Sequence, residues 1–217
     1  YLLIKEGKGN NIFSAPGLTY IKEKKYERQL GRIIHNDTYS KPLDWGKTCE
    51  IIAFEKLGLE YKIQSDEVII HKDYPFWSGS PDCIKYVNDT TVIPDIKCPF
   101  TIKSYCDAVE NLTLNCWDFF NGDKYYWQIV SNCILLGTDV GELIYYIPYK
   151  KDLEEIRERS NYSWIKKAKD DELPYLIEDN KFYKDIYVYK FKINVEDINL
   201  LEQRVIMAND LINSNKI

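Results

Sequence analysis

Two short β-type runs separated by a polar turn constrain the fold of this chain more than any other feature. The runs read PDCIKYV and TTVIPDIKCP, and Asn88 and Asp89 lie between them. Short runs rich in β-branched and aromatic residues, bounded by turn residues, indicate paired strands of a hairpin. Each run also carries an aspartate, Asp82 or Asp95, which a hydrophobic core does not accommodate without a partner.

The remaining pattern predicts a mixed α/β fold, with a central sheet flanked by helices. Helical and strand patterns do not alternate regularly, so a repeated βαβ architecture is not expected. The residues up to Tyr20 are predicted to be loop, and residues 151–172 are ambiguous. Helices are predicted at 20–34, 44–59 (capped by Asp44 and ended by Gly58), 104–114, 123–137 and 195–214, and further strands at 61–70, 141–149 and 182–193.

Length and composition favour one domain in an aqueous compartment. The chain has 217 residues and 45% apolar residues, enough for a packed core. No apolar run approaches the roughly 20 residues that cross a bilayer. The six cysteines form no C-x-x-C pair, which favours reduced thiols in an intracellular, cytoplasmic protein. The net charge of −5 argues against wholesale nucleic-acid binding but not against a local basic surface. Both histidines, His35 and His71, are interpreted as surface or loop residues.

The acidic residues of the hairpin are predicted to converge. If the two runs pair, Asp82 and Asp95 lie toward the same end of neighbouring strands. Side chains alternate between the faces of a strand, so Asp95, Lys97 and Ile93 share one side while Ile96 faces the other. This arrangement places two acids and one amine together beside apolar residues.

A third acid is predicted to join them from the preceding helix. Glu50 shares a helical stripe with Ala53, Phe54 and Leu57, its i+3, i+4 and i+7 neighbours. An acid on a stripe that faces the core is costly to bury unless a positive group meets it. Glu50 is therefore a candidate ligand for a cation.

Clustered carboxylates with a nearby lysine suit one kind of chemistry. The acids repel one another unless a metal ion neutralises them. Oxygen ligands without histidine or thiolate suit Mg²⁺ or Mn²⁺ better than zinc. Such an ion activates water and polarises phosphate, and a lysine stabilises the developing charge. The alternative is that Pro-Asp is a capped turn and Asp-x-Lys a surface ion pair.

These residues resemble the signature of the PD-(D/E)XK nucleases. The matching segments are Glu50, Ser80-Pro81-Asp82 and Asp95-Ile96-Lys97. Within that superfamily, WSGSPDCIKY, IPDIKCP, YYWQIVSNCILLG and GELIYYIPY resemble the YqaJ-like viral recombinases, which include the lambda-type phage exonucleases. The resemblance extends from about Trp45 to Tyr149.

The resemblance implies a restriction-endonuclease-like three-layer core and a role for each matching residue. Mg²⁺, or Mn²⁺ in its place, would be held by Glu50, Asp82, Asp95 and the backbone carbonyl of Ile96. Lys97 would position the attacking water, and Gln128 would lie near the metal or the scissile phosphate. Many lambda-type members have glutamate where this chain has Asp95. Candidates for nucleic-acid binding are Arg28, Arg32 and Ser80.

The chain is thus expected to be a single nuclease domain, 1–217, with its core at about 45–149 and flanking elements 1–44 and 150–217. The expected function is Mg²⁺-dependent hydrolysis of DNA, as a 5′–3′ exonuclease serving phage recombination. The resemblance implies double-stranded DNA with a free end, a single-strand annealing protein and a homotrimer as partners, and no membrane. The alternatives are a non-catalytic DNA-binding or assembly module and a structure-specific endonuclease of the same superfamily.

Overall fold

The computed structural model describes residues 1–9, 11–34, 39–63, 68–178 and 181–214. Five strands of the described chain form a mixed sheet in the order β1-β4-β5-β6-β7. The β5–β6 pair is parallel and the other neighbours are antiparallel. The strands are β1 (Tyr61–Ile63), β4 (Cys83–Val87), β5 (Thr90–Lys97), β6 (Val140–Tyr146) and β7 (Ile186–Lys192), and a separate two-stranded sheet contains β2 (Ile69–Ile70) and β3 (Ser78–Gly79).

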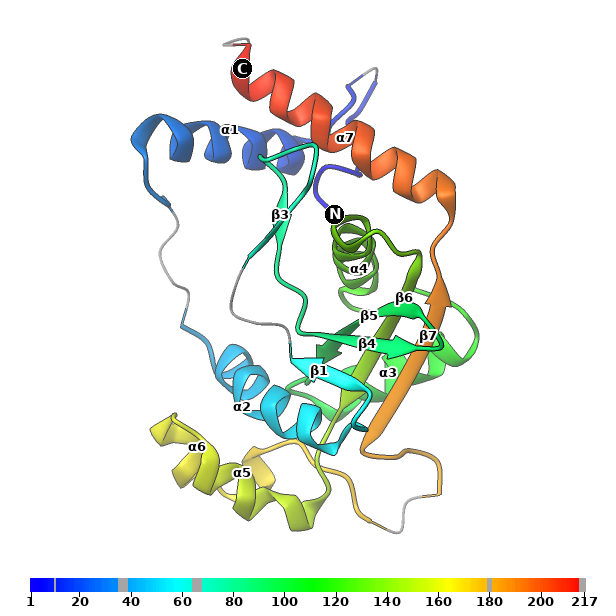
Figure 1. The fold of residues 1–217 in the computed structure, drawn as a ribbon. Coiled ribbons are helices and arrows are strands. Elements are labelled where there is room, and N and C mark those ends of the chain that lie inside the picture. The colour runs from blue at the N-terminus through cyan, green and yellow to red at the C-terminus, as the bar shows by residue number, and fades with distance from the viewer. Residues whose placement is uncertain (10, 35–38, 64–67, 179–180, 215–217) are drawn as a thin grey trace.

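Helices cover both faces of the sheet, which confirms the predicted mixed α/β class. Helix α4 packs on one face of β5 and β6, and α2 packs on the other. Helices α1 and α7 cross at one end of the molecule, while α2, α5 and α6 lie at the other (Figure 1). The helices are α1 (Ala15–Leu30), α2 (Lys41–Lys56), α3 (Ile102–Thr113), α4 (Gly122–Leu136), α5 (Leu153–Arg159), α6 (Ser163–Lys167) and α7 (Val195–Asn213).

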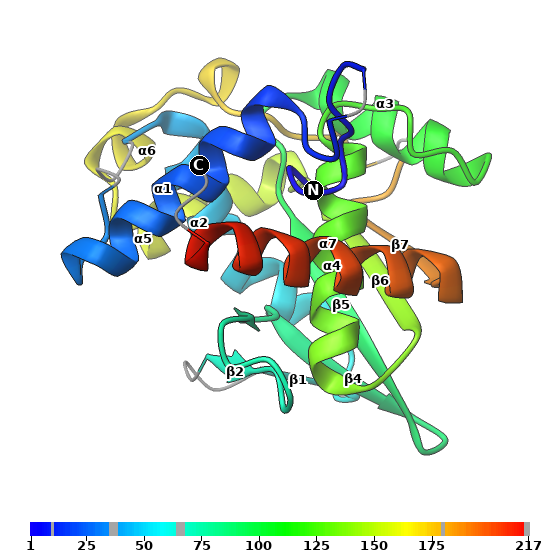
Figure 2. The same cartoon turned by 90° about the horizontal axis from the view of Figure 1, so that it is seen from above.

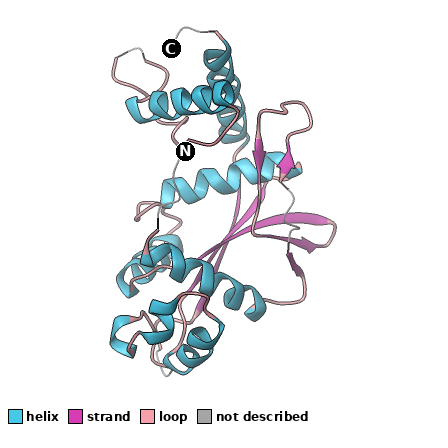
Figure 3. Ribbon diagram, turned by 90° about the vertical axis from the view of Figure 1, so that its left-hand side faces the viewer, coloured by secondary structure: helices cyan, strands magenta, loops and turns pink. Residues whose placement is uncertain are grey.

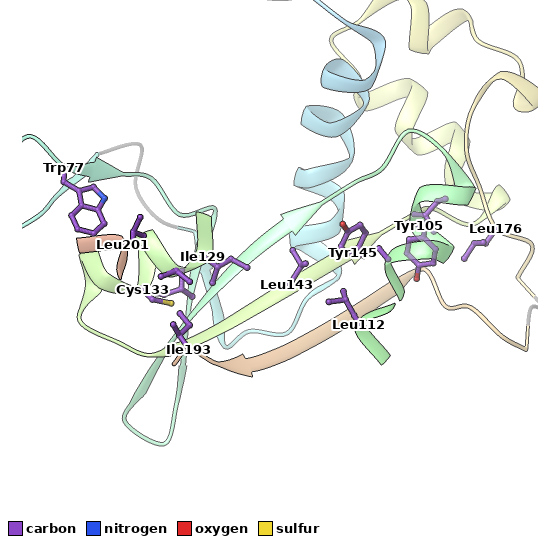
Figure 4. Close-up of a cluster of buried hydrophobic side chains, with 14 residues drawn as sticks. Trp77, Tyr105, Leu112, Ile129, Cys133, Leu143, Tyr145, Leu176, Ile193 and Leu201 are labelled. Atoms are coloured by element: carbon purple, nitrogen blue, oxygen red, sulfur yellow. The ribbon is translucent and has the colours of Figure 1, made fainter. Parts of the chain in front are cut away.

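Both faces of strand β6 are buried in the hydrophobic core. Leu143 and Tyr145 pack with α4 residues such as Ile129 (Figure 4), whereas Ile144 and Tyr146 pack against the cluster around α2. A strand buried on both faces is expected to be apolar throughout rather than alternating. The run LIYYI in the sequence is therefore the central strand of a three-layer core, as the resemblance implied.

The predicted hairpin of β4 and β5 is confirmed. Val87 pairs with Thr90, so Asn88 and Asp89 form a two-residue turn. Both turn residues have positive φ, of 46° and 62°, as the right-handed twist of a tight hairpin requires. The β4–β5 and β2–β3 hairpins project beyond the helices (Figures 2 and 3).

Several predicted boundaries are wrong, for local reasons. Helix α1 already begins at Ala15, because Ser14 caps it and its hydroxyl accepts a hydrogen bond from the Gly17 amide. Helix α2 begins at Lys41 with Ser40 as its cap. Asp44, predicted to be that cap, lies inside the helix and accepts a hydrogen bond from the Trp164 indole.

Two further interpretations are corrected. The run from 61 to 70 is not one strand, because β1 and β2 belong to different sheets. His71 lies in a loop, as predicted, but it is buried rather than on the surface: 6% of its surface is exposed, and its ring stacks on Tyr74 and Trp77. Its Nδ1 accepts hydrogen bonds from the Asp73 and Tyr74 amides. His35 lies outside the described residues. None of the described helices is long and apolar enough to span a bilayer.

Close packing of α4 on β6 gives a stability prediction. A Cβ atom on Gly141 would lie 2.5 Å from Ile129 Cγ2 and 3.0 Å from Phe191 Cζ. Gly141→Ala is therefore expected to lower the free energy of unfolding by about 1–3 kcal/mol, because a packed core absorbs added volume poorly. Urea denaturation measures the change. Gly46→Ala is the control: a Cβ there meets nothing within 4 Å in the middle of α2, so a gain of about 0.5–1 kcal/mol is expected. A neutral Gly141→Ala would contradict this packing.

Candidate active site where strands β4 and β5 separate

The candidate site lies where β4 leaves β5. The two strands pair only from Lys85↔Val92 to Val87↔Thr90, although β4 continues back to Cys83 and pairs with β1 along its other edge. The edge of β5 after Val92 therefore has no neighbouring strand on that side. Asp82 fills part of the gap, because its Oδ2 accepts a hydrogen bond from the Ile96 amide at 2.8 Å.

This gap explains a proline inside a central strand. The backbone N–H and C=O groups of successive residues point to opposite edges of a strand, so those of Pro94 and Ile96, two residues apart, point to the same edge. A proline has no amide hydrogen and is tolerated only where no ladder hydrogen bond is needed. Pro94 thus lies where β4 has already departed, and the next amide on that edge is satisfied by Asp82.

Asp95 and Lys97 lie together on the α4 side of β5, as predicted. Asp95 is fully buried, and Lys97 Nζ lies 2.6 Å from its Oδ2. The ammonium also lies 5.0 Å from the centre of the Tyr125 ring of α4. Burial raises the pKa of Asp95 to about 6, against the influence of Lys97 and with a further increase from Asp82. Burial tends to lower the pKa of Lys97, but the carboxylates of Asp95 and Asp82 hold it above its ordinary value.

Glu50 completes the group from α2. Burial raises the pKa of its carboxyl to about 7; Asp82 and Asp95 raise it further, and Lys97 opposes them. The same three hairpin residues therefore act electrostatically on a side chain from a different layer of the fold. The convergence of Glu50 with Asp82, Asp95 and Lys97 into one metal site stays a prediction.

The donor set fits a hard cation. Oδ1 of Asp95 has no hydrogen-bond partner among the described residues, although the side chain is buried. Oδ2 contacts the Lys97 ammonium, which is the one ion pair of Asp95 in the described chain. An ionised buried group of this kind is costly unless a cation meets it. Among the described residues, no three His, Cys, Asp or Glu side chains already form a set that could hold a metal ion. A metal would therefore require small side-chain rotations and would compete with the Lys97 ammonium.

Gln128 and Ser80 border this group without a contact to it. Gln128 is half-buried on α4, between Tyr125 one turn before and Asn132 one turn after. Tyr125 lies under Lys97, and Asn132 lies against Gly79, two residues before Pro81. The helix face that carries Gln128 therefore borders the segment leading to Asp82. Ser80 is exposed in that segment.

The two arginine candidates lie in a different part of the fold. Arg28 donates hydrogen bonds to Asn209 and Asn213, which are on α7. It therefore takes part in the crossing of α1 with α7. Arg32 is exposed just after α1. No contact joins either residue to the acidic group, so their role in binding DNA stays a prediction.

Sequence reasoning missed two features next to the site. The first is Tyr125, because nothing in the sequence pattern indicates that its ring would lie beside the Lys97 ammonium. The second feature is a buried network of Tyr61, Lys85 and Glu142. A signal for it existed, because Glu142 is an acid inside an otherwise apolar run, and such a residue needs a buried partner.

Comparison with known proteins agrees with this geometry. Residues 10–140, more than half of the chain, match the YqaJ-like viral recombinase domain. The match begins before Trp45, where the resemblance of the sequence motifs begins. No curated protein sequence matches the chain significantly.

Solved exonuclease structures share the fold. A phage-related exonuclease from Haemophilus somnus 129PT superposes with a TM-score of 0.67 at 18% identity, covering 98% of this chain and 90% of that one. The alkaline exonuclease LHK-Exo from Laribacter hongkongensis gives a TM-score of 0.58 at 14% identity, covering 99% and 87%. LHK-Exo in complex with dAMP gives 0.59 at 15%, covering 93% and 82%.

The shared sheet, the hairpin motif and the family match lead to one assignment. The chain belongs to the YqaJ-like viral recombinase domain family.

Proposed function

We propose that the protein is a Mg²⁺-dependent exonuclease that degrades double-stranded DNA from a free end in the 5′–3′ direction. The observation that carries the proposal is the group formed where β4 leaves β5. There Asp82 caps the Ile96 amide, and the buried Asp95 is paired with Lys97. The complex of one structural neighbour with dAMP supports a DNA substrate.

The proposed metal ligands are oxygen atoms from three elements. They are the carboxylates of Glu50, Asp82 and Asp95 and the backbone carbonyl of Ile96. Strand geometry supports the Ile96 carbonyl as a ligand, because the amide and carbonyl of one residue point to the same edge of a strand. Its amide points to Asp82, so its carbonyl addresses that edge as well.

Each side chain has a distinct role in the proposed reaction. A bound Mg²⁺ would supply Lewis acidity, which lowers the pKa of water and polarises the scissile phosphate. Lys97 would orient the attacking water and stabilise the negative charge that develops on the phosphate oxygens. Tyr125 would keep the ammonium in place through its ring. Gln128 would bind near the scissile phosphate, and Arg28, Arg32 and Ser80 would contact the DNA backbone.

The proposal extends to partners that fit this activity. An enzyme that removes one strand of a duplex leaves single-stranded tails, which a single-strand annealing protein can use in recombination. The proposed setting is the cytoplasm of a bacterial host, and the proposed assembly is a trimer. Size-exclusion chromatography with light scattering measures that assembly directly.

Direction and end dependence are tested with labelled DNA. Linear duplex carrying a 5′ label is expected to release labelled mononucleotide at once, while a 3′ label appears only late in the digestion. Closed circular duplex is expected to remain intact, because it offers no end. Cleavage of the circle would identify an endonuclease of the same superfamily. DNA binding without turnover in any divalent metal would identify a non-catalytic module.

The acidic group predicts a pH-dependent stabilisation by metal. Glu50 and Asp95 have raised pKa values in the folded protein, about 7 and about 6, so they favour folding when protonated and oppose it as the pH rises through these values. A bound divalent cation offsets this loss of folding stability, but only when the carboxylates are ionised. Saturating Mg²⁺ is therefore expected to raise Tm by about 5–10 °C near pH 8 and far less near pH 5.5.

Differential scanning calorimetry measures these shifts, and a monovalent salt at equal ionic strength is the control. An equal rise in Tm at both pH values would contradict metal binding by these acids.

A further inference from the structure

A buried ion pair bridges the sheet on its α2 side. Lys85 Nζ on β4 lies 3.1 Å from Glu142 Oε1 on β6. The ammonium also donates a hydrogen bond to the Tyr61 hydroxyl at 2.8 Å, and that hydroxyl donates to Glu142 Oε2 at 2.9 Å. Glu142 is 1% exposed, so its charge depends on these two groups. The network passes over β5, which separates β4 from β6 in the sheet.

Fold stability alone does not account for this network. Transferring two charges from water to the interior is costly, and apolar residues of similar size are often at least as stable. The surrounding cluster is otherwise apolar, with Ile96, Ile144 and Tyr146 on the same face. An ion pair is a directional contact, so it fixes the separation and the relative orientation of the two strands that carry it.

The position of Lys85 connects the network to the acidic group. Lys85 is the last residue of β4 that pairs with β5 before the strands separate, and Asp82 lies three residues upstream. Only Cys83 and Ile84, both buried, separate Asp82 from Lys85, so a short stretch of β4 joins the network to the acidic group.

We propose that Tyr61, Lys85 and Glu142 are positioning residues, which set how far β4 departs from β5 and so the spacing between Asp82 and Asp95. The Lys85–Glu142 pair holds β4 to β6 at the point of separation. Because this pair fixes the position of β4, Asp82 accepts the hydrogen bond from the Ile96 amide from a fixed position. The spacing of the carboxylates determines how well they share a divalent cation, so the network tunes metal affinity. This inference rests on the proposed function.

The test measures metal affinity rather than cleavage. Lys85→Met/Glu142→Leu removes both charges together, so neither is left alone in the interior. Mn²⁺ is titrated into the metal-free protein, and the loss of the free-ion signal in electron paramagnetic resonance gives the dissociation constant. This constant is expected to rise by about 10-fold or more, the range found when groups behind metal ligands are removed. Lys85→Arg, which keeps the charge, is expected to retain most of the affinity.

A milder variant keeps the test decisive if the double variant does not fold. Tyr61→Phe retains the ring and removes only the hydroxyl that links the other two groups, and the dissociation constant is expected to rise by about 10-fold, the lower end of that range. The matched control is Lys56→Met. Lys56 lies 3.4 Å from both Asp152 and Asp185 in an ion-pair group at the surface, and its loss is expected to leave Mn²⁺ binding unchanged.

The outcomes separate the two proposals. If the unaltered protein binds no Mn²⁺, the proposed function fails. If it binds Mn²⁺ and the folded variants of the network bind equally well, only the positioning role is overturned. The same holds if Lys56→Met weakens binding as much as Tyr61→Phe, because a general loss of rigidity would then explain both.

Discussion

Lys97→Met is expected to lower the rate of DNA hydrolysis by about 10²–10³-fold while leaving metal binding intact. The ammonium lies 2.6 Å from Asp95, and no other described lysine or arginine makes an ion pair with that residue. Without it, the group loses the ammonium that would orient water and stabilise the phosphate oxygens. Methionine has a similar length and fills the space beside Tyr125. Single-turnover cleavage of labelled duplex at saturating Mg²⁺ measures the chemical step.

Metal binding gives the second half of this prediction. Removing the ammonium leaves Asp95 buried without its charge partner, so the metal-free variant is expected to be less stable near neutral pH. A divalent cation then no longer competes with Lys97, and the rise in Tm on adding Mn²⁺ is expected to exceed that of the unaltered protein. Lys103→Met, at an exposed ion pair on α3, is the control and should change neither quantity. Unimpaired cleavage by Lys97→Met would remove the lysine from the mechanism.

Asp82→Asn is expected to abolish measurable Mn²⁺ binding and to lower cleavage by more than about 10³-fold. Asparagine retains an oxygen that can accept the hydrogen bond from the Ile96 amide, so the contact across the gap between β4 and β5 is kept. The substitution removes only the charge. The Tm of the metal-free protein is therefore expected to change little, which separates loss of a ligand from loss of the fold.

The control for Asp82→Asn comes from the same hairpin. Asp89 is exposed in the turn and has a φ of 62°, a conformation that asparagine also adopts readily. Asp89→Asn makes the same chemical change a few residues away and is expected to leave binding and cleavage unaltered. Isothermal titration with Mn²⁺ and the labelled-duplex assay measure both variants. Retained metal affinity in Asp82→Asn would show that the cation is held elsewhere.

Local pattern was sufficient for the parts of the site that depend on a single element. Alternation along β5 placed Asp95 and Lys97 on one side, and the structure joins them in an ion pair. Helical spacing placed Glu50 on the stripe with Ala53, which is fully buried. The hairpin turn followed from Asn88 and Asp89, because few other residues adopt positive φ at two successive positions.

The sequence by itself determined which side chains share a face, since periodicity is a property of one strand or one helix. Only the tertiary structure decided where β4 separates from β5, and hence that Asp82 meets the Ile96 amide. It also decided that Glu142 meets Lys85 across an intervening strand. These contacts join residues from separate elements, and their geometry depends on how strands pair and part, which no local pattern specifies.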